Sequence, residues 1–114
     1  MSKRILIADD EAHVVFILFE FLTGEGYEVS IVRTGKELYT LLSGSYEYYD
    51  LVISDVLMPE GEGIESVEMA QIFGSEIPVI YMTGFSDISL ENDLILSKPL
   101  NLSYLLEKIK ELTE

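Results

Sequence analysis

Cysteine is absent from this sequence, and basic residues and prolines are scarce. Without cysteine the chain can form neither a disulfide framework nor a thiolate metal site. Only 7 lysines and arginines face 21 aspartates and glutamates, so the net charge is −14. That balance argues against binding to nucleic acid, which needs clustered basic residues, and against binding to an anionic membrane surface. With 48% hydrophobic residues and only 3 prolines, the composition is that of a folded chain rather than a disordered one.

Long hydrophobic runs are also missing. The longest one, Val14 to Phe19, is far too short to span a bilayer. The N-terminus offers only the apolar run Ile5 to Ala8 before two aspartates, which does not fit a signal peptide. We therefore expect a cytoplasmic protein whose 114 residues form a single domain, 1–114, with a core of its own.

Short apolar runs alternate with segments of helical pattern along the chain. We predict strands at 4–8, 27–32, 51–54, 78–82 and 94–97, and helices at 11–24, 35–42, 63–73, 86–91 and 102–112. This alternation predicts an α/β protein, with a parallel sheet covered by helices on both faces. Right-handed crossovers leave few topologies, so we expect a flavodoxin-like three-layer sandwich with its five strands in the order 2-1-3-4-5. About five helices complete it, and the fourth is shortened and poor in helix-forming residues.

Charged side chains follow three of the predicted strands. Asp9 and Asp10 follow the first strand, Asp55 follows the third, and Lys98 follows the fifth. The carboxyl ends of parallel strands share one rim of the sheet, and in the predicted order the first and third strands are neighbours. Three carboxylates and one ammonium at that rim suggest a site for a divalent cation and a phosphoryl group.

Four short motifs, in this order and at these spacings, resemble the receiver domain of two-component response regulators. They are Asp9-Asp10, then Asp55-Val56-Leu57-Met58-Pro59 with Gly63, then Thr83-Gly84, and then Lys98-Pro99. The resemblance covers the whole chain. It implies that Asp55 is phosphorylated, that Mg²⁺ is required, and that the donor is a histidine kinase or a histidine phosphotransfer protein. It also implies a signalling module with an unidentified protein target, and not an enzyme, since such a module catalyses only its own phosphorylation and dephosphorylation.

The residues themselves suit this chemistry. Mg²⁺ prefers oxygen ligands and keeps several waters. Asp10 and Asp55 can each offer a carboxylate oxygen, Asp9 would bind through water or orient Asp10, and in receivers the main-chain carbonyl at the position of Leu57 is a further ligand. Near a cation Asp55 stays ionised and can attack phosphorus in line.

The transferred phosphoryl group needs donors for its oxygens. We predict that Lys98 supplies one, and that the Thr83 hydroxyl and the Gly84 amide supply another. Glycine at position 84 leaves the backbone open to close approach. In receivers the bond corresponding to Lys98-Pro99 is typically cis.

Two departures from the receiver pattern keep a second hypothesis open. Ile95 stands three residues before Lys98, where most receivers carry Tyr or Phe, and the segment from Thr83 to Lys98 is several residues shorter than usual. A pseudo-receiver would have the same fold but would act as a protein-interaction scaffold without phosphorylation. A haloacid-dehalogenase-type phosphatase fits less well, because it needs a second acid where Leu57 stands. An FMN-binding flavodoxin needs a glycine- and hydroxyl-rich loop where this chain has Asp9-Asp10-Glu11.

The helix predicted at 11–24 has one apolar side and one polar side. The residues expected on the buried side are Val14, Val15, Leu18, Phe19, Phe21 and Leu22. Phe16 falls on the polar arc with His13 and Glu20, and we expect His13 to be solvated rather than a ligand. A single exposed aromatic residue needs no explanation. The alternative is that Phe16 helps to dock the phosphoryl donor, because in receivers this helix contacts it.

Overall fold

The computed structural model describes residues 2–56, 76–84 and 94–114. The helices predicted at 63–73 and 86–91 lie outside these residues, and so do Leu57 and the rest of its motif up to Gly63. The described strands are β1 (Arg4–Ala8), β2 (Glu28–Val32), β3 (Leu51–Asp55), β4 (Val79–Thr83) and β5 (Leu94–Ser97). They form one parallel sheet in the order β2-β1-β3-β4-β5. The predicted strand order is therefore confirmed.

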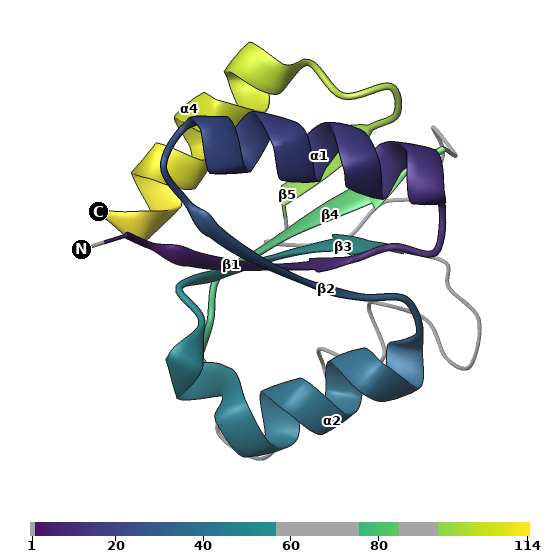
Figure 1. Ribbon diagram of the computed structural model, residues 1–114, viewed down its shortest axis with the longest axis vertical. Helices are drawn as coiled ribbons and strands as arrows, with labels where there is room; N and C mark the ends of the chain where they lie inside the picture. The colour runs from purple at the N-terminus through teal and green to yellow at the C-terminus, as the bar shows by residue number, and fades with distance from the viewer. Residues whose placement is uncertain (1, 57–75, 85–93) are drawn as a thin grey trace.

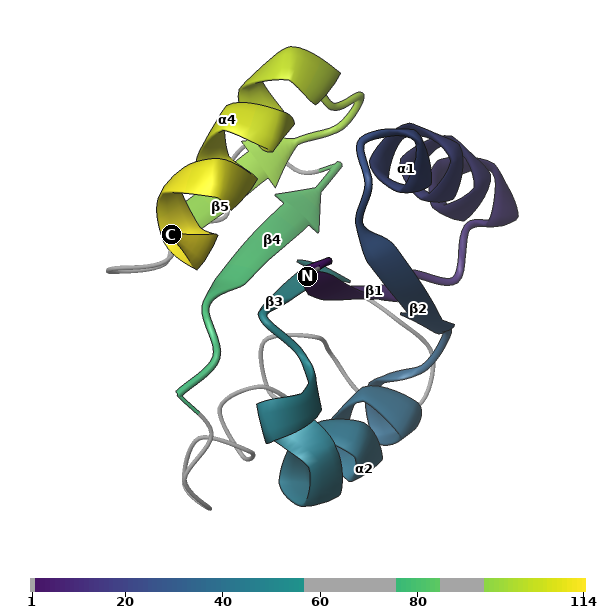
Figure 2. The same ribbon diagram turned by 60° about the vertical axis from the view of Figure 1, so that its left-hand side comes forward.

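Helices cover both faces of this sheet. Helices α1 (Ala12–Gly24) and α4 (Leu102–Thr113) lie on one face, and α2 (Gly35–Ser45) lies on the other (Figure 1). The turned view in Figure 2 separates α1 and α4 above the sheet from α2 below it. The three-layer α/β architecture predicted from the sequence is thus confirmed.

The core consists of two apolar clusters, one on each side of the sheet. In β1, Ile5 and Ile7 face α1 and α4, whereas Leu6 and Ala8 face α2. Alternate residues of a strand point to opposite faces, so a strand covered on both sides must be apolar throughout. The helices contribute Leu18 and Leu22 from α1, Leu105 and Ile109 from α4, and Leu38 and Leu42 from α2, all of which are buried.

The helix ends follow from local chemistry. At the start of α4 the Asn101 side chain accepts a hydrogen bond of 3.0 Å from the Tyr104 backbone N–H, which confirms the predicted N-cap. After α1 the chain turns through Gly26, whose φ of 96° lies in the left-handed region where glycine is favoured.

Two details of the helices differ from the prediction. Helix α2 runs through Ser45 and continues into a 3₁₀ turn, Tyr46–Tyr48, instead of ending at residue 42. A helix tolerates an internal glycine such as Gly44 at a modest cost, so this glycine does not stop it. On α1, Phe19 is 38% exposed rather than buried, because its position lies at the margin of the apolar side.

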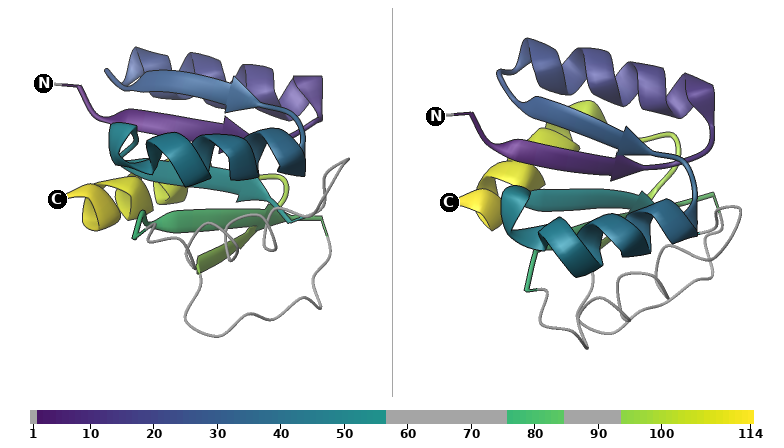
Figure 3. Two further views of the ribbon diagram at one scale, coloured as in Figure 1. Left: turned by 90° about the horizontal axis from the view of Figure 1, so that it is seen from below. Right: turned by 60° about the horizontal axis from the view of Figure 1, so that its bottom comes forward.

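The parallel strands all end at one rim of the sheet. Figure 3 shows the strand arrows pointing the same way, with β1 beginning and α4 ending at the opposite edge. The loops that follow β1 and β5 therefore leave from the same rim. This arrangement brings residues from distant parts of the sequence together there.

Candidate functional site

The strand register places the predicted site residues side by side. Asp9 follows β1 directly, Asp55 ends β3, Thr83 ends β4, and Lys98 follows β5. The rim is held by backbone hydrogen bonds: the Lys98 N–H donates to the Thr83 carbonyl at 2.8 Å, and the Val56 N–H donates to the Met82 carbonyl at 3.0 Å. Each side chain is thus placed by a strand end rather than by a free loop.

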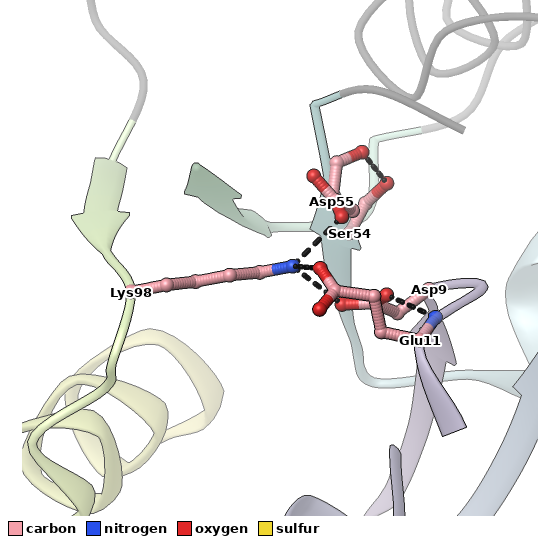
Figure 4. Close-up of polar contacts among 5 residues, drawn as sticks. All are labelled: Asp9, Glu11, Ser54, Asp55 and Lys98. Carbon is pink, nitrogen blue, oxygen red and sulfur yellow. Dashed lines mark hydrogen bonds and ion pairs between the residues drawn. The ribbon is translucent and has the colours of Figure 1, made fainter. Parts of the chain in front are cut away.

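Lys98 connects the carboxylates of the rim. Its Nζ donates a hydrogen bond of 2.8 Å to Asp55 Oδ2 and one of 2.7 Å to Glu11 Oε1, and it lies 3.1 Å from Asp9 Oδ2 (Figure 4). Burial lowers the pKa of Lys98, but its contacts with the carboxylates of Asp55, Glu11 and Asp9 outweigh this effect and raise the pKa above its ordinary value. Lys98 is therefore a firmly charged counter-ion for this cluster.

Asp9 is the most deeply buried charged group of the cluster. Its side chain is 0% exposed, and its Oδ1 accepts a hydrogen bond of 2.8 Å from the Glu11 backbone N–H. Burial raises the pKa of Asp9, although the Glu11 N–H and the Lys98 ammonium act in the opposite direction. The nearby charge of Asp55 adds to the increase. Asp9 is therefore held ionised only against the cost of burial.

Glu11 belongs to the cluster, although the sequence did not single it out. Its side chain is 56% exposed, and the hydrogen bond from Lys98 lowers the pKa of its carboxyl. In the sequence Glu11 looks like an ordinary acid at the first turn of a helix, where negative charge is favourable. Its position directly after the acid pair was the available signal.

The other predicted residues have different surroundings. Asp10 is exposed and does not belong to the group formed by Asp9, Glu11 and Asp55. Thr83 is buried beside Lys98 at the end of β4, and Gly84 is exposed with open space where a Cβ would stand. The Lys98-Pro99 peptide bond is cis, as expected.

The described side chains fit a magnesium ion. Carboxylate oxygens of Asp9, Glu11 and Asp55 lie within 4.8 Å of one another. Within the described part of the chain, the buried Asp9 Oδ2 accepts no hydrogen bond beyond its ion pair with Lys98. An all-oxygen, negatively charged set of this kind suits a hard divalent cation.

Comparisons with known proteins agree with this geometry. Residues 5–110 match the family model of the response regulator receiver domain. A curated relative, the response regulator receiver protein CpdR of Brucella abortus, is 31% identical over 96% of this chain and 96% of its own length. The chain therefore belongs to the receiver domains of two-component response regulators, which are signalling domains. Other curated relatives are longer, and the matched part covers 34% of their length.

Solved structures support the same family. A CheY-like receiver domain from Methanospirillum hungatei has a TM-score of 0.84 and 35% identity, covering 97% of this chain and 93% of its own. The response regulator TrrA of Thermotoga maritima, solved in complex with Mg²⁺-BeF, has a TM-score of 0.83 and 34% identity, covering 96% of this chain and 98% of its own. Among the described residues, no helix is long and apolar enough to cross a membrane.

Proposed function

We propose that this chain, taken as one receiver domain over residues 1–114, is a phosphoacceptor switched by phosphorylation of Asp55. The observation that carries the proposal is the position of Lys98, whose Nζ contacts Asp55 Oδ2 at 2.8 Å beside the buried Asp9. An aspartate nucleophile with a fixed ammonium next to it is suited to accept a phosphoryl group and to neutralise its charge. The donor in this proposal is a histidine kinase or a histidine phosphotransfer protein.

The proposed cofactor is Mg²⁺, held by Asp9, Asp10 and Asp55 with the main-chain carbonyl of Leu57. Its chemistry would be to neutralise the carboxylates and to polarise a phosphoryl oxygen. The Mg²⁺-BeF complex of TrrA, a relative at 34% identity, supports this assignment. A cytoplasmic location is part of the same proposal. It rests on the acidic composition of the sequence and on the shortness of its hydrophobic runs.

The proposed transfer takes place at the end of β3, where Asp55 lies. A carboxylate oxygen of Asp55 forms a bond to phosphorus while the bond from phosphorus to the donor nitrogen breaks, and the departing histidine keeps that electron pair. Lys98 then donates to one phosphoryl oxygen, and the Thr83 hydroxyl with the Gly84 N–H donates to another. The buried Asp9 stays beside Lys98 and keeps its ammonium charged.

Intact mass measured after incubation with acetyl phosphate tests this proposal. We expect one phosphoryl adduct on the wild type in the presence of Mg²⁺ and none in EDTA. Asp55→Asn should give no adduct, whereas Glu20→Gln, which removes a charge from an exposed position of α1, should behave as wild type. A folded wild type that forms no adduct would favour the pseudo-receiver, a scaffold that works without phosphorylation.

A groove beside Lys98 is the proposed docking place of the donor. It has a volume of about 320 Å³ and lies between α1 and the segment after β5, where Ile17, Pro99 and Leu100 line it next to Lys98. Ile17 is 39% exposed. Phe16, which precedes it in α1 and is 63% exposed, does not line this groove and instead lies near Phe19 and Ile31. A helix of a donor laid along this groove would bring its phosphohistidine close to Asp55, so α1 provides an apolar contact for it.

Substitutions on α1 separate docking from chemistry. Phe16→Ala and Ile17→Ala should slow phosphorylation from a histidine phosphotransfer protein but leave phosphorylation by acetyl phosphate unchanged. Leu112→Ala is a matched control on α4, since Leu112 is also 39% exposed. Normal transfer from the protein donor in both α1 variants would rule out this docking surface.

A further inference from the structure

The contact between Glu11 and Lys98 has no part in the function proposed above. At 2.7 Å it is the shortest of the three contacts that Lys98 Nζ makes with carboxylates, compared with 2.8 Å to Asp55 and 3.1 Å to Asp9. Glu11 contributes this contact from the N-cap position, directly before α1 (Figure 4). The best-placed acceptor for the ammonium is thus a group that is neither nucleophile nor buried counter-charge.

Of these three acceptors, Glu11 is the one that can leave. Its side chain is 56% exposed, so its carboxylate can turn into solvent and be hydrated there. Asp9 is 0% exposed and is fixed by the Glu11 backbone N–H, whereas Asp55 is 10% exposed and ends a central strand. An ammonium has three donor hydrogens, so a phosphoryl oxygen on Asp55 needs one of them to become available.

We propose that Glu11 is a positioning residue that holds Lys98 in the unphosphorylated protein and gives up this contact to the phosphoryl group. This inference rests on the proposed function, because it assigns to Lys98 an oxygen of the phosphoryl group on Asp55. The contact exists before transfer and is lost after it, so it favours the unphosphorylated state. The negative charge of Glu11 also repels the incoming phosphoryl group, which acts in the same direction.

The same charge has the opposite effect on the cation. A carboxylate within 4.8 Å of Asp9 and Asp55 attracts Mg²⁺ to the cluster. Loss of the Glu11 charge should therefore raise the Mg²⁺ concentration needed for half-maximal phosphorylation, and it should also raise the rate at saturating Mg²⁺. Two effects of opposite sign in a single titration are a signature that general damage to the fold would not produce.

Two variants separate the contact from the charge. Glu11→Gln keeps the length of the side chain and removes its charge, whereas Glu11→Asp keeps the charge and shortens the reach toward Lys98. At saturating Mg²⁺ both should be phosphorylated by acetyl phosphate about two- to five-fold faster than wild type, the range expected for loss of one exposed ion pair. Only Glu11→Gln should need more Mg²⁺. Glu20→Gln, an equal charge change elsewhere on α1, should alter neither quantity.

A measurement without phosphorylation completes the test. In Mg²⁺-free protein, the ¹⁵Nζ resonance of Lys98 should move in both Glu11 variants and stay in place in Glu20→Gln. Unchanged or slower phosphorylation of the Glu11 variants at saturating Mg²⁺, or an unmoved Lys98 resonance, would overturn the inference. If instead wild type itself forms no adduct while the Lys98 resonance moves as expected, the proposed function fails and the Glu11–Lys98 contact stands.

Discussion

Replacing Lys98 with methionine tests the electrostatic design of the cluster. Methionine keeps much of the apolar stem but removes the ammonium that lies 2.8 Å from Asp55 and 3.1 Å from Asp9. Those two carboxylates are 10% and 0% exposed, so neither can recover full hydration in place of the lost ion pair. We therefore expect Lys98→Met to destabilise the protein when no metal ion is present.

The magnitude follows from burial. Removing one partner of a buried ion pair typically costs about 3–5 kcal/mol. The loss should be smaller here, because Asp9, whose pKa burial raises, can take up a proton instead of remaining an unpaired charge. The exposed Glu11 adds at most about 1 kcal/mol. A loss of about 2–3 kcal/mol in the free energy of unfolding corresponds to a fall in Tm of roughly 10 °C for a chain of this size.

Thermal unfolding in EDTA and in Mg²⁺ provides the assay. A bound cation replaces the missing positive charge, so Mg²⁺ should raise the Tm of Lys98→Met more than that of wild type. Lys108→Met is the control: Lys108 pairs with Glu111 on the surface of α4, and its loss should leave the stability close to that of wild type. If Lys98→Met is as stable as wild type in EDTA, or loses the same stability with and without Mg²⁺, Lys98 is not the counter-ion of these carboxylates.

Three further outcomes follow from the same structure. Asp9→Asn should stabilise the protein in EDTA at pH 7. Because burial raises the pKa of Asp9 above 3.8, the stability of wild type should fall as pH rises through the folded-state pKa. Urea unfolding of the variant over the same pH range should not show this fall in stability. Asn101→Ala removes the cap on the Tyr104 N–H and should cost about 1 kcal/mol by urea unfolding. Leu105→Ala, at a fully buried position, should cost about 2–5 kcal/mol by the same assay, whereas Leu112→Ala, at a position 39% exposed, should cost far less.

The sequence predicted the fold well because the strands are buried on both faces. Such strands appear as short apolar runs, and their order follows from few topological choices. Among the residues that the structure describes, strand and helix boundaries were predicted to within a few residues, and the largest difference was at the end of α2. The residues around Gly44 predicted a helix end, but an internal glycine costs a helix only about 1 kcal/mol, and the helix continues through Ser45.

For the candidate site, the sequence predicted only which residues lie together at the carboxyl ends of the strands. That Asp9, Asp55 and Lys98 meet follows from topology, and the structure brings them together; their chemical roles remain predictions. The sequence could not tell which of two adjacent acids is buried, and the structure buries Asp9 while leaving Asp10 exposed. It could not predict the contact between Glu11 and Lys98 either. These residues are 87 positions apart in the sequence, and whether they meet depends on the conformations of two long side chains.

The assembly of the site from distant strand ends also bears on how the protein folds. The bonds from Lys98 to Asp55 and Glu11 join residues 43 and 87 positions apart, so they form only after β1, β3 and β5 have taken their places in the sheet. Contacts of such long range are typically made late in folding. Mg²⁺ should then slow unfolding while leaving the folding rate nearly unchanged. A chain whose last strand has not yet joined the sheet cannot bring Lys98 to Asp55, so an incompletely folded chain would not respond to a phosphoryl donor.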